Sequence, residues 1–198
     1  MTDRAGTAMD ETTDAEIIAA SAVDAASFGL LFDRHVDRIY AYIVRRVGPS
    51  LAEELTAETF ARAFADRARF IPLQESAGPW LYGIATNLIH NARRAERRRL
   101  AAYERAWARP PVSSDDFDRA DSRVDADRVA PRLIAALIRM EPGDRDALLL
   151  FAWQELTYDE IGVALGIPAG TVASRINRAR RRLRASLGET GDDRMGAV

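Results

Sequence analysis

The chain has 198 residues, of which 47% are hydrophobic and 29% charged, with two histidines and no cysteine. This composition excludes a disulfide framework and a zinc site of Cys and His ligands, and no apolar run approaches the roughly 18 residues of a membrane span. We therefore expect a soluble, cytoplasmic protein without metal, cofactor or membrane insertion. The net charge is -2, but acidic and basic residues are concentrated in different parts of the chain. The first 27 residues are acidic, whereas residues 173–187 carry six arginines and no acid.

The N-terminal region begins with a polar segment, residues 1–13, that has no periodicity and is expected to be a disordered tail. Asp14 is placed to cap a short helix that runs through Ser21. Ser27 is placed to cap a second helix, in which apolar residues recur at three- and four-residue spacing as far as Val47. These two helices are therefore expected to bury one face each.

Two more helices are predicted after residues 48–50, where Gly, Pro and Ser end the second one. A regular apolar stripe over residues 52–64 indicates the third helix. Residues 70–79 break the pattern and predict a loop, with Pro79 suited to the first turn of a fourth helix. The apolar stripe of this helix ends at Ala92 and gives way to a basic segment.

A domain boundary is predicted where the composition changes, at residues 109–128, which contain two adjacent prolines at 110 and 111 and are rich in Ser and Asp. Beyond it, apolar spacing predicts helices from Val129 and after Pro142. No segment alternates as a strand does, so we expect an all-α fold. It comprises two small helical domains, residues 14–108 and 129–188, joined by an acidic flexible linker and followed by a tail at 189–198.

The C-terminal domain carries a helix-turn-helix pattern. Thr157 and Glu160 have the spacing of a capping box, and Gly166 supplies the left-handed residue that closes the helix. A second helix follows from about Gly170 to Leu187, keeping an apolar stripe inward. Its short side chains can approach base edges in a major groove and its arginines can bind phosphates. The predicted DNA-binding residues are Thr171, Ala173, Ser174, Arg175, Asn177, Arg178, Arg181 and Arg182.

Three motifs resemble one known family, the extracytoplasmic-function (ECF) sigma factors of bacterial RNA polymerase. They are TYDEIGVALGIPAGTVASRINRARRRL at 157–183, AEELTAETF at 52–60, and WLYGIATN at 80–87 followed by two arginines at 93 and 94. They stand in the family's order and spacing, and the resemblance covers about residues 14–188.

The resemblance implies a region 2 domain at 14–108 that binds core polymerase and melts the minus-ten element, and a region 4 domain at 129–188 that reads the minus-thirty-five element. The positions implied to meet the clamp helices of the largest polymerase subunit are Glu54, Leu55, Ala57 and Glu58. Those implied to bind minus-ten DNA are Asn87, Asn91, Arg93 and Arg94, with Asn87 helping to hold a flipped base. The polymerase flap, promoter DNA and an anti-sigma factor are the other implied partners.

The chain departs from the family pattern at several of these positions. Ala57 stands where Gln is usual, Thr86 where Arg is common, Asn91 where Asp is common, and Ala173 where a longer side chain often reads the minus-thirty-five element. Trp80 is interpreted as a packing residue. The linker resembles the family segment that threads the polymerase's RNA path, and its composition fits a flexible spacer equally well.

Other functions remain open from the residues alone. Since there is no Gly-rich phosphate loop and no cluster of carboxylates and His, we expect no catalytic residues and no enzyme activity. The main alternative is a stand-alone helix-turn-helix regulator that binds paired half-sites as a dimer. A third is an interaction module whose arginine helix pairs with an acidic partner.

Overall fold

The computed structural model describes residues 12–72, 76–107 and 130–187. These residues form helices and turns without any strand, as predicted for an all-α fold. The chain divides into two compact units, Met1–Ala108 and Arg109–Val198, which are described separately. The predicted linker, the predicted C-terminal tail and residues 1–11 lie outside the described residues. No helix within the described ranges is long and apolar enough to cross a membrane.

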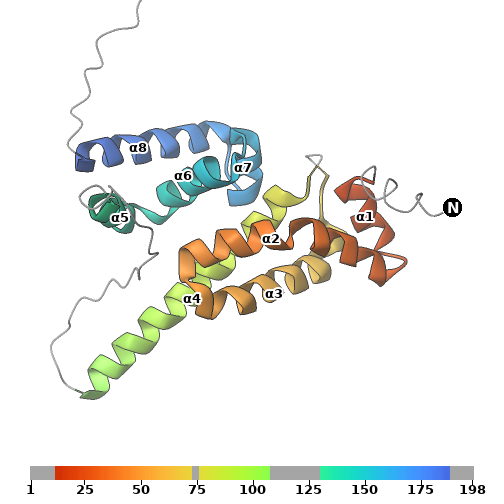
Figure 1. Cartoon of the computed structure of the whole chain (residues 1–198), viewed down its shortest axis with the longest axis horizontal. Helices are drawn as coiled ribbons and strands as arrows, with labels where there is room; N and C mark the ends of the chain where they lie inside the picture. Colours follow the sequence, from red (N-terminus) through yellow and green to blue (C-terminus); the bar gives the residue numbers. More distant parts are fainter. Residues whose placement is uncertain (1–11, 73–75, 108–129, 188–198) are drawn as a thin grey trace, which may run out of the picture. The chain divides into compact units, whose positions relative to one another are not determined.

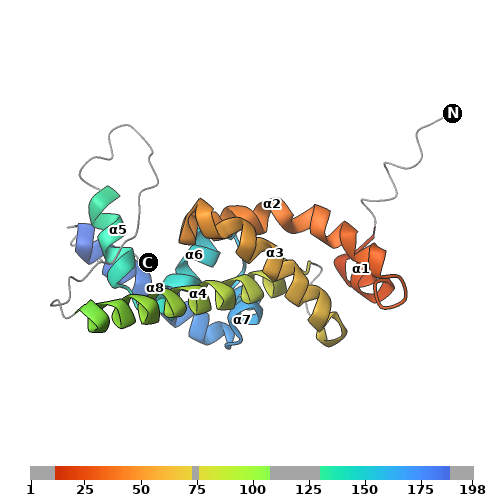
Figure 2. The same cartoon turned by 90° about the horizontal axis from the view of Figure 1, so that it is seen from below.

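The N-terminal unit is built on three long helices that pack side by side, α2, α3 and α4 (Figures 1 and 2). A short helix, α1, packs against α2. The elements are α1 (Asp14–Ala20), η1 (Ala25–Ser27), α2 (Phe28–Val47), α3 (Pro49–Asp66), η2 (Arg67–Arg69) and α4 (Gly78–Trp107). Their shared core contains Leu31, Ile39, Tyr42, Ile43, Ala52, Leu55, Phe60, Ala63, Leu81, Ala85, Leu88 and Ile89.

The caps predicted for the first two helices are wrong. Thr13, not Asp14, caps α1, and it forms a capping box with Glu16: the Glu16 backbone N–H donates to the Thr13 hydroxyl oxygen at 3.2 Å. Asp14 is the first helical residue and is buried. Ser27 makes no capping hydrogen bond with its side chain, because the chain enters α2 from a 3-10 turn that Asp24 caps.

A single glycine joins α2 to α3. Gly48 has φ +77°, a left-handed value that costs a side-chain-bearing residue strain, and Pro49 begins α3 at once. Because the joint is one residue long, the two helices fold back on each other, which brings the predicted polymerase-binding residues of α3 and the core of α2 into one unit.

The C-terminal unit comprises α5 (Ala130–Arg139), α6 (Pro142–Gln154), α7 (Tyr158–Leu165) and α8 (Ala169–Leu187). α5, α6 and α7 all pack on α8, so the last helix forms the centre of this unit. The predicted capping box is confirmed: the Thr157 N–H and hydroxyl both donate to Glu160 Oε2, at 2.7 and 2.8 Å. Gly166 closes α7 with φ +63°, also as predicted.

Candidate functional site

Helix α8 has a buried apolar side and an exposed polar side. Val172, Ile176 and Ala179 are fully buried against the other three helices of the unit. Among the predicted DNA-binding residues, Ser174, Asn177, Arg178, Arg181 and Arg182 are exposed, and Thr171, Ala173 and Arg175 are partly buried. The structure therefore brings most of the predicted set to one side of a single helix, which suits a surface that enters a groove of duplex DNA.

Two of the predicted DNA-binding arginines have intramolecular contacts with the start of α6. Arg178 donates from Nε and from one terminal nitrogen to the buried carboxylate of Asp144, at 3.1 and 2.9 Å. The guanidinium of Arg175 lies over Gly143, where an added Cβ would be 2.7 Å from a terminal nitrogen. By contrast, Arg181 and Arg182 make no ion pair with any residue in the described ranges. These contacts join α8 to α6 without using Arg181 or Arg182.

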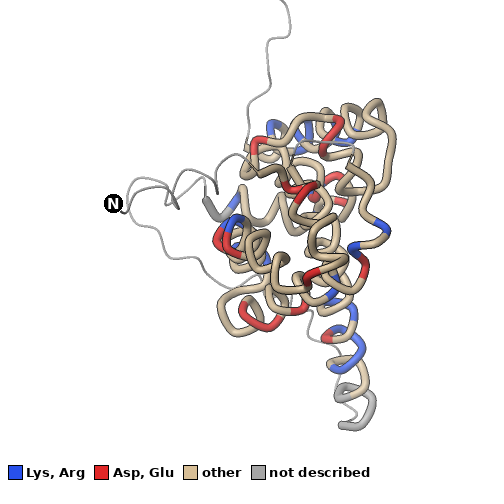
Figure 3. Tube along the Cα trace, turned by 90° about the vertical axis from the view of Figure 1, so that its right-hand side faces the viewer, with Lys and Arg blue, Asp and Glu red and all other residues tan. Residues whose placement is uncertain are grey.

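The predicted minus-ten residues are carried by α4. Asn87, Asn91 and Arg94 are exposed, and their spacing of four and three residues places them on one face of the helix. Arg98, also exposed, continues this stripe at the same spacing, and the sequence analysis did not select it. Figure 3 shows basic positions recurring along the C-terminal half of α4, at the bottom of the view. We call Asn87, Asn91, Arg94 and Arg98 the α4 stripe.

Arg93 and Thr86 lie on a different side of α4 from the α4 stripe. Arg93 donates to the backbone carbonyl of Arg46 near the end of α2, at 2.5 Å, so its guanidinium holds two helices together. Thr86 is 4% exposed, and its hydroxyl forms a 2.8 Å hydrogen bond with the Tyr42 hydroxyl. At position 86, where Arg is common in the family, this chain therefore has a buried Thr that hydrogen-bonds within the core.

The aromatic residue at the start of α4 packs as predicted. The rings of Trp80 and Phe70 lie with their centroids 5.1 Å apart. Phe70 follows η2, so this contact joins the segment after α3 to the first turn of α4.

The predicted polymerase-binding residues of α3 fall into two groups. Glu54 and Ala57 are exposed, and Glu58 is partly exposed and pairs with Arg62 one turn later. Leu55 is different: its side chain is 5% exposed and belongs to the core of the unit. The prediction that Leu55 contacts the polymerase is corrected, because its side chain is buried in the core and is not available at the surface. Leu51, which is 40% exposed, lies beside Glu54 and Glu58 by helical spacing.

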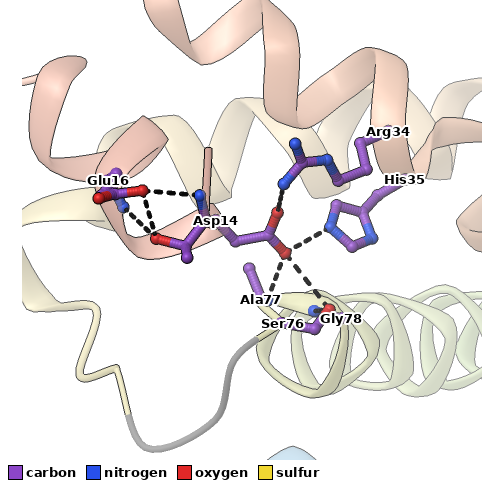
Figure 4. A network of polar contacts seen from close by, with 8 residues as sticks. Asp14, Glu16, Arg34, His35, Ser76, Ala77 and Gly78 are labelled. Atoms are coloured by element: carbon purple, nitrogen blue, oxygen red, sulfur yellow. Dashed lines mark hydrogen bonds and ion pairs between the residues drawn. The ribbon is translucent and has the colours of Figure 1, made fainter. Parts of the chain in front are cut away.

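A buried polar cluster that the sequence analysis missed surrounds Asp14 (Figure 4). The Asp14 carboxylate accepts hydrogen bonds from Arg34 at 2.6 Å, from the Ala77 backbone N–H at 2.7 Å and from Ser76 at 3.3 Å. His35 Nε2 lies 2.7 Å from the same carboxylate. Burial by itself would raise the pKa of Asp14, but the hydrogen bonds from His35 and from the Ala77 amide, with the nearby Arg34, hold it well below its usual range.

Family models match both units. The model described as Sigma-70 region 2 matches residues 31–99, and the model described as Sigma-70, region 4 matches residues 131–183. The ECF RNA polymerase sigma factor SigE of Mycolicibacterium smegmatis is 37% identical over 184 residues, which cover 90% of this chain and 69% of that protein. The chain belongs to the ECF sigma factors. RNA polymerase sigma factor CarQ of Myxococcus xanthus is 32% identical over 82% of the chain and 90% of its own length.

Solved structures show the same fold for this sigma factor. The sigma factor RpoE of Bartonella quintana, solved in complex with the anti-sigma factor NepR, has a TM-score of 0.60 at 20% identity, covering 81% of this chain and 96% of that one. CnrH, solved in complex with the cytosolic domain of CnrY, has a TM-score of 0.61 at 22% identity over 90% and 99% of the two chains. As an ECF sigma factor, the protein directs promoter-specific transcription initiation by RNA polymerase.

Proposed function

We propose that the two units divide this task between three surfaces. The acidic face of α3 docks on core polymerase, the α4 stripe binds the melted minus-ten strand, and the exposed side of α8 binds the minus-thirty-five duplex. The observation that carries the proposal is that one small unit exposes both an acidic face on α3, with Glu54 and Glu58, and a face of asparagines and arginines on α4. An acidic face suits a basic protein partner, and an Asn and Arg face suits nucleic acid.

The chemistry of the α4 stripe fits a single strand. The amide of Asn87 can both donate to and accept from the edge of an extruded base, and Arg94 and Arg98 supply positive charge for the backbone. The extrusion costs a few kcal/mol of unstacking, which contacts with the open strand must offset. The neighbouring Trp80 contributes by packing on Phe70.

On α8 the short side chains and the arginines have different functions. Ser174 donates its hydroxyl proton to the Thr171 carbonyl at 2.9 Å, which leaves its oxygen free to accept from a base. Asn177 is exposed with an amide that can donate and accept. Arg181 and Arg182 bind phosphates, and such contacts position the helix rather than specify sequence. Specificity at this element therefore depends on Ser174 and Asn177.

The polymerase supplies the phosphoryl-transfer chemistry in this proposal, and the sigma factor contributes no catalytic group. The chain acts where the polymerase is, in the cytoplasm. An anti-sigma factor is a further proposed partner, supported by the similar fold of a sigma factor that was solved with one. A tagged full-length chain recovered from its host with a stoichiometric protein that blocks its transcription activity would establish that partner.

The decisive experiment is run-off transcription with purified core polymerase, with and without the full-length chain, on genomic fragments that include the region upstream of its own gene. We expect discrete new transcripts that are lost in the Glu54→Lys/Glu58→Lys variant. The matched control is Asp33→Lys/Asp37→Lys, which changes the same charge at the same i, i+4 spacing on exposed positions of α2. The control is expected to keep its activity.

The outcome that would overturn the proposal is a chain that binds duplex DNA alone but gives core polymerase no new start site on any fragment. Equal loss of transcripts in the α3 variant and the α2 control would instead refute α3 as the docking face.

A further inference from the structure

Asp14 is a buried carboxylate in a small domain, a placement with a large desolvation cost. It is 3% exposed, and its carboxylate pairs with the guanidinium of Arg34 and lies within hydrogen-bond distance of the His35 ring, both on α2. An apolar side chain at such a site is often as stable or more stable than a buried ion pair, so stability alone is a weak explanation of the carboxylate. A buried charge is better suited to fixing one arrangement of the elements that it joins.

The arrangement that Asp14 fixes is the beginning of α4. The carboxylate accepts from the Ala77 backbone N–H, the residue immediately before α4, and from the Ser76 hydroxyl. The Ser76 oxygen in turn accepts from the Gly78 N–H at 3.0 Å. Asp14 and Ser76 therefore satisfy backbone donors at the N-terminus of α4, where a negative charge also complements the helix dipole. Figure 4 shows these contacts converging from α1, α2 and the start of α4.

The position of Asn87 follows from where α4 begins. Gly78 and Asn87 belong to one continuous helix, nine residues and about 14 Å apart at 1.5 Å per residue. A rotation or shift of the first turn is carried along the helix to the α4 stripe. The Asp14 contacts span 63 residues of sequence, and Asp14 itself lies before the residues that the region 2 model matches.

We propose that Asp14 is a positioning residue for minus-ten recognition, which sets the α4 stripe in register with the open strand by anchoring the start of α4. This inference rests on the proposed function of α4. Asp14 contacts no DNA in this proposal, and it acts through Ala77 and Ser76.

The test compares Asp14→Asn with Ile17→Val in holoenzymes made from core polymerase and the full-length chain. Ile17 lies in the same helix and is 1% exposed, so its truncation is a core lesion of α1 that removes none of the hydrogen bonds between Asp14 and the start of α4. Three affinities are measured: for core polymerase, for a minus-thirty-five duplex, and for a single-stranded oligonucleotide with the non-template minus-ten sequence of a promoter mapped by run-off. We expect Asp14→Asn to weaken oligonucleotide binding about tenfold and to leave the other two affinities unchanged, as Ile17→Val leaves all three.

A milder variant keeps the test sharp if Asp14→Asn folds poorly. Ser76→Ala removes the hydrogen bond that Ser76 donates to Asp14 and the one that it accepts from the Gly78 N–H, but it leaves Asp14 paired with Arg34, and we expect roughly threefold weaker oligonucleotide binding. Equal oligonucleotide affinities for wild type, Asp14→Asn and Ser76→Ala would overturn the role of Asp14 and leave the proposed function intact. A wild-type holoenzyme that initiates nowhere would overturn the proposed function and this inference with it.

Discussion

The Arg178 guanidinium binds the Asp144 carboxylate through two hydrogen bonds, and Asp144 is 3% exposed while the Arg178 side chain is 46% exposed. This pair joins α8 to the first turn of α6. Arg181 differs from Arg178 in this respect: it is exposed and makes no ion pair within the described part of the chain.

The pair predicts different defects for the two arginines. Arg181→Ala should weaken promoter binding and reduce the slope of log affinity against log salt by about one, because one phosphate contact is lost. Arg178→Ala should leave the slope unchanged and lower the free energy of unfolding, because Asp144 is left buried without its partner. Salt titrations of holoenzyme on a promoter and urea unfolding of the chain measure the two effects. An Arg178→Ala slope that falls as far as that of Arg181→Ala would show that Arg178 contacts DNA.

Arg93 and Arg94 should differ in the same manner, although they are neighbours in sequence. Arg93 is bonded to the Arg46 carbonyl, whereas Arg94 is part of the exposed α4 stripe. We expect Arg94→Ala to slow open-complex formation with no change in melting temperature. Arg93→Ala should lower the melting temperature, since a charged hydrogen bond to a helix end contributes roughly 1.5–3 kcal/mol. Open-complex kinetics and thermal unfolding on the same preparations distinguish the variants, and a reversed pattern would contradict the assignment.

The lowered pKa of Asp14 predicts a specific dependence of stability on pH. A carboxyl group whose pKa is depressed in the folded state stabilises the fold above its unfolded pKa, near 3.8, and loses this contribution as the pH falls through the folded value. Asp14→Asn should therefore be less stable than wild type at pH 7, by about 1–3 kcal/mol, and the difference should narrow below pH 4. Urea unfolding from pH 7 to pH 2 measures it. A difference that stays constant down to pH 2 would refute this account.

Gly162 and Gly170 give a matched pair of glycine substitutions around the helix-turn-helix. A Cβ at Gly162 would lie 2.8 Å from the Ile167 carbonyl oxygen, a backbone atom, whereas a Cβ at Gly170 would meet nothing within 4 Å. We expect Gly162→Ala to destabilise the chain by about 1–3 kcal/mol, since the turn must move. Gly170→Ala should be neutral or stabilising by up to about 1 kcal/mol through better helix propensity. Thermal unfolding measures both, and equal effects would show that the turn accommodates the methyl group.

Local sequence patterns predicted the features that depend on nearby residues. Thr157 and Glu160 of the capping box are three residues apart, and Gly166 directly follows the helix that they begin. Both features can therefore be predicted from one short segment. The buried stripe of α8 follows from helical spacing in the same way. The exposure of Glu54, Ala57 and Asn87 was likewise implied by the apolar positions around them.

Features that depend on residues far apart in the chain could not be predicted from the local sequence. Asp14 resembles a helix cap in its local segment, and only the fold brings Arg34 and Ala77 to its carboxylate. In the sequence, Arg178 looks like the other exposed arginines of its helix, because its partner Asp144 lies 34 residues earlier. Leu55 stands within a surface motif, yet its side chain points into the core. In each case the partners come from another helix, and no periodicity within one helix specifies them.

Helix α4 runs without interruption from Gly78 to Trp107, which at 1.5 Å per residue is about 45 Å. Asn87 and Arg98 are eleven residues apart on one face, a separation of about 16 Å at 1.5 Å per residue. In the proposed complex, an amide that holds one base therefore fixes how far along the strand the last arginine of the stripe meets the backbone. Phosphate footprints of Asn87 and Arg98 variants should therefore be offset by this fixed interval, and the interval between the two contacts is a property of the helix rather than of the promoter sequence.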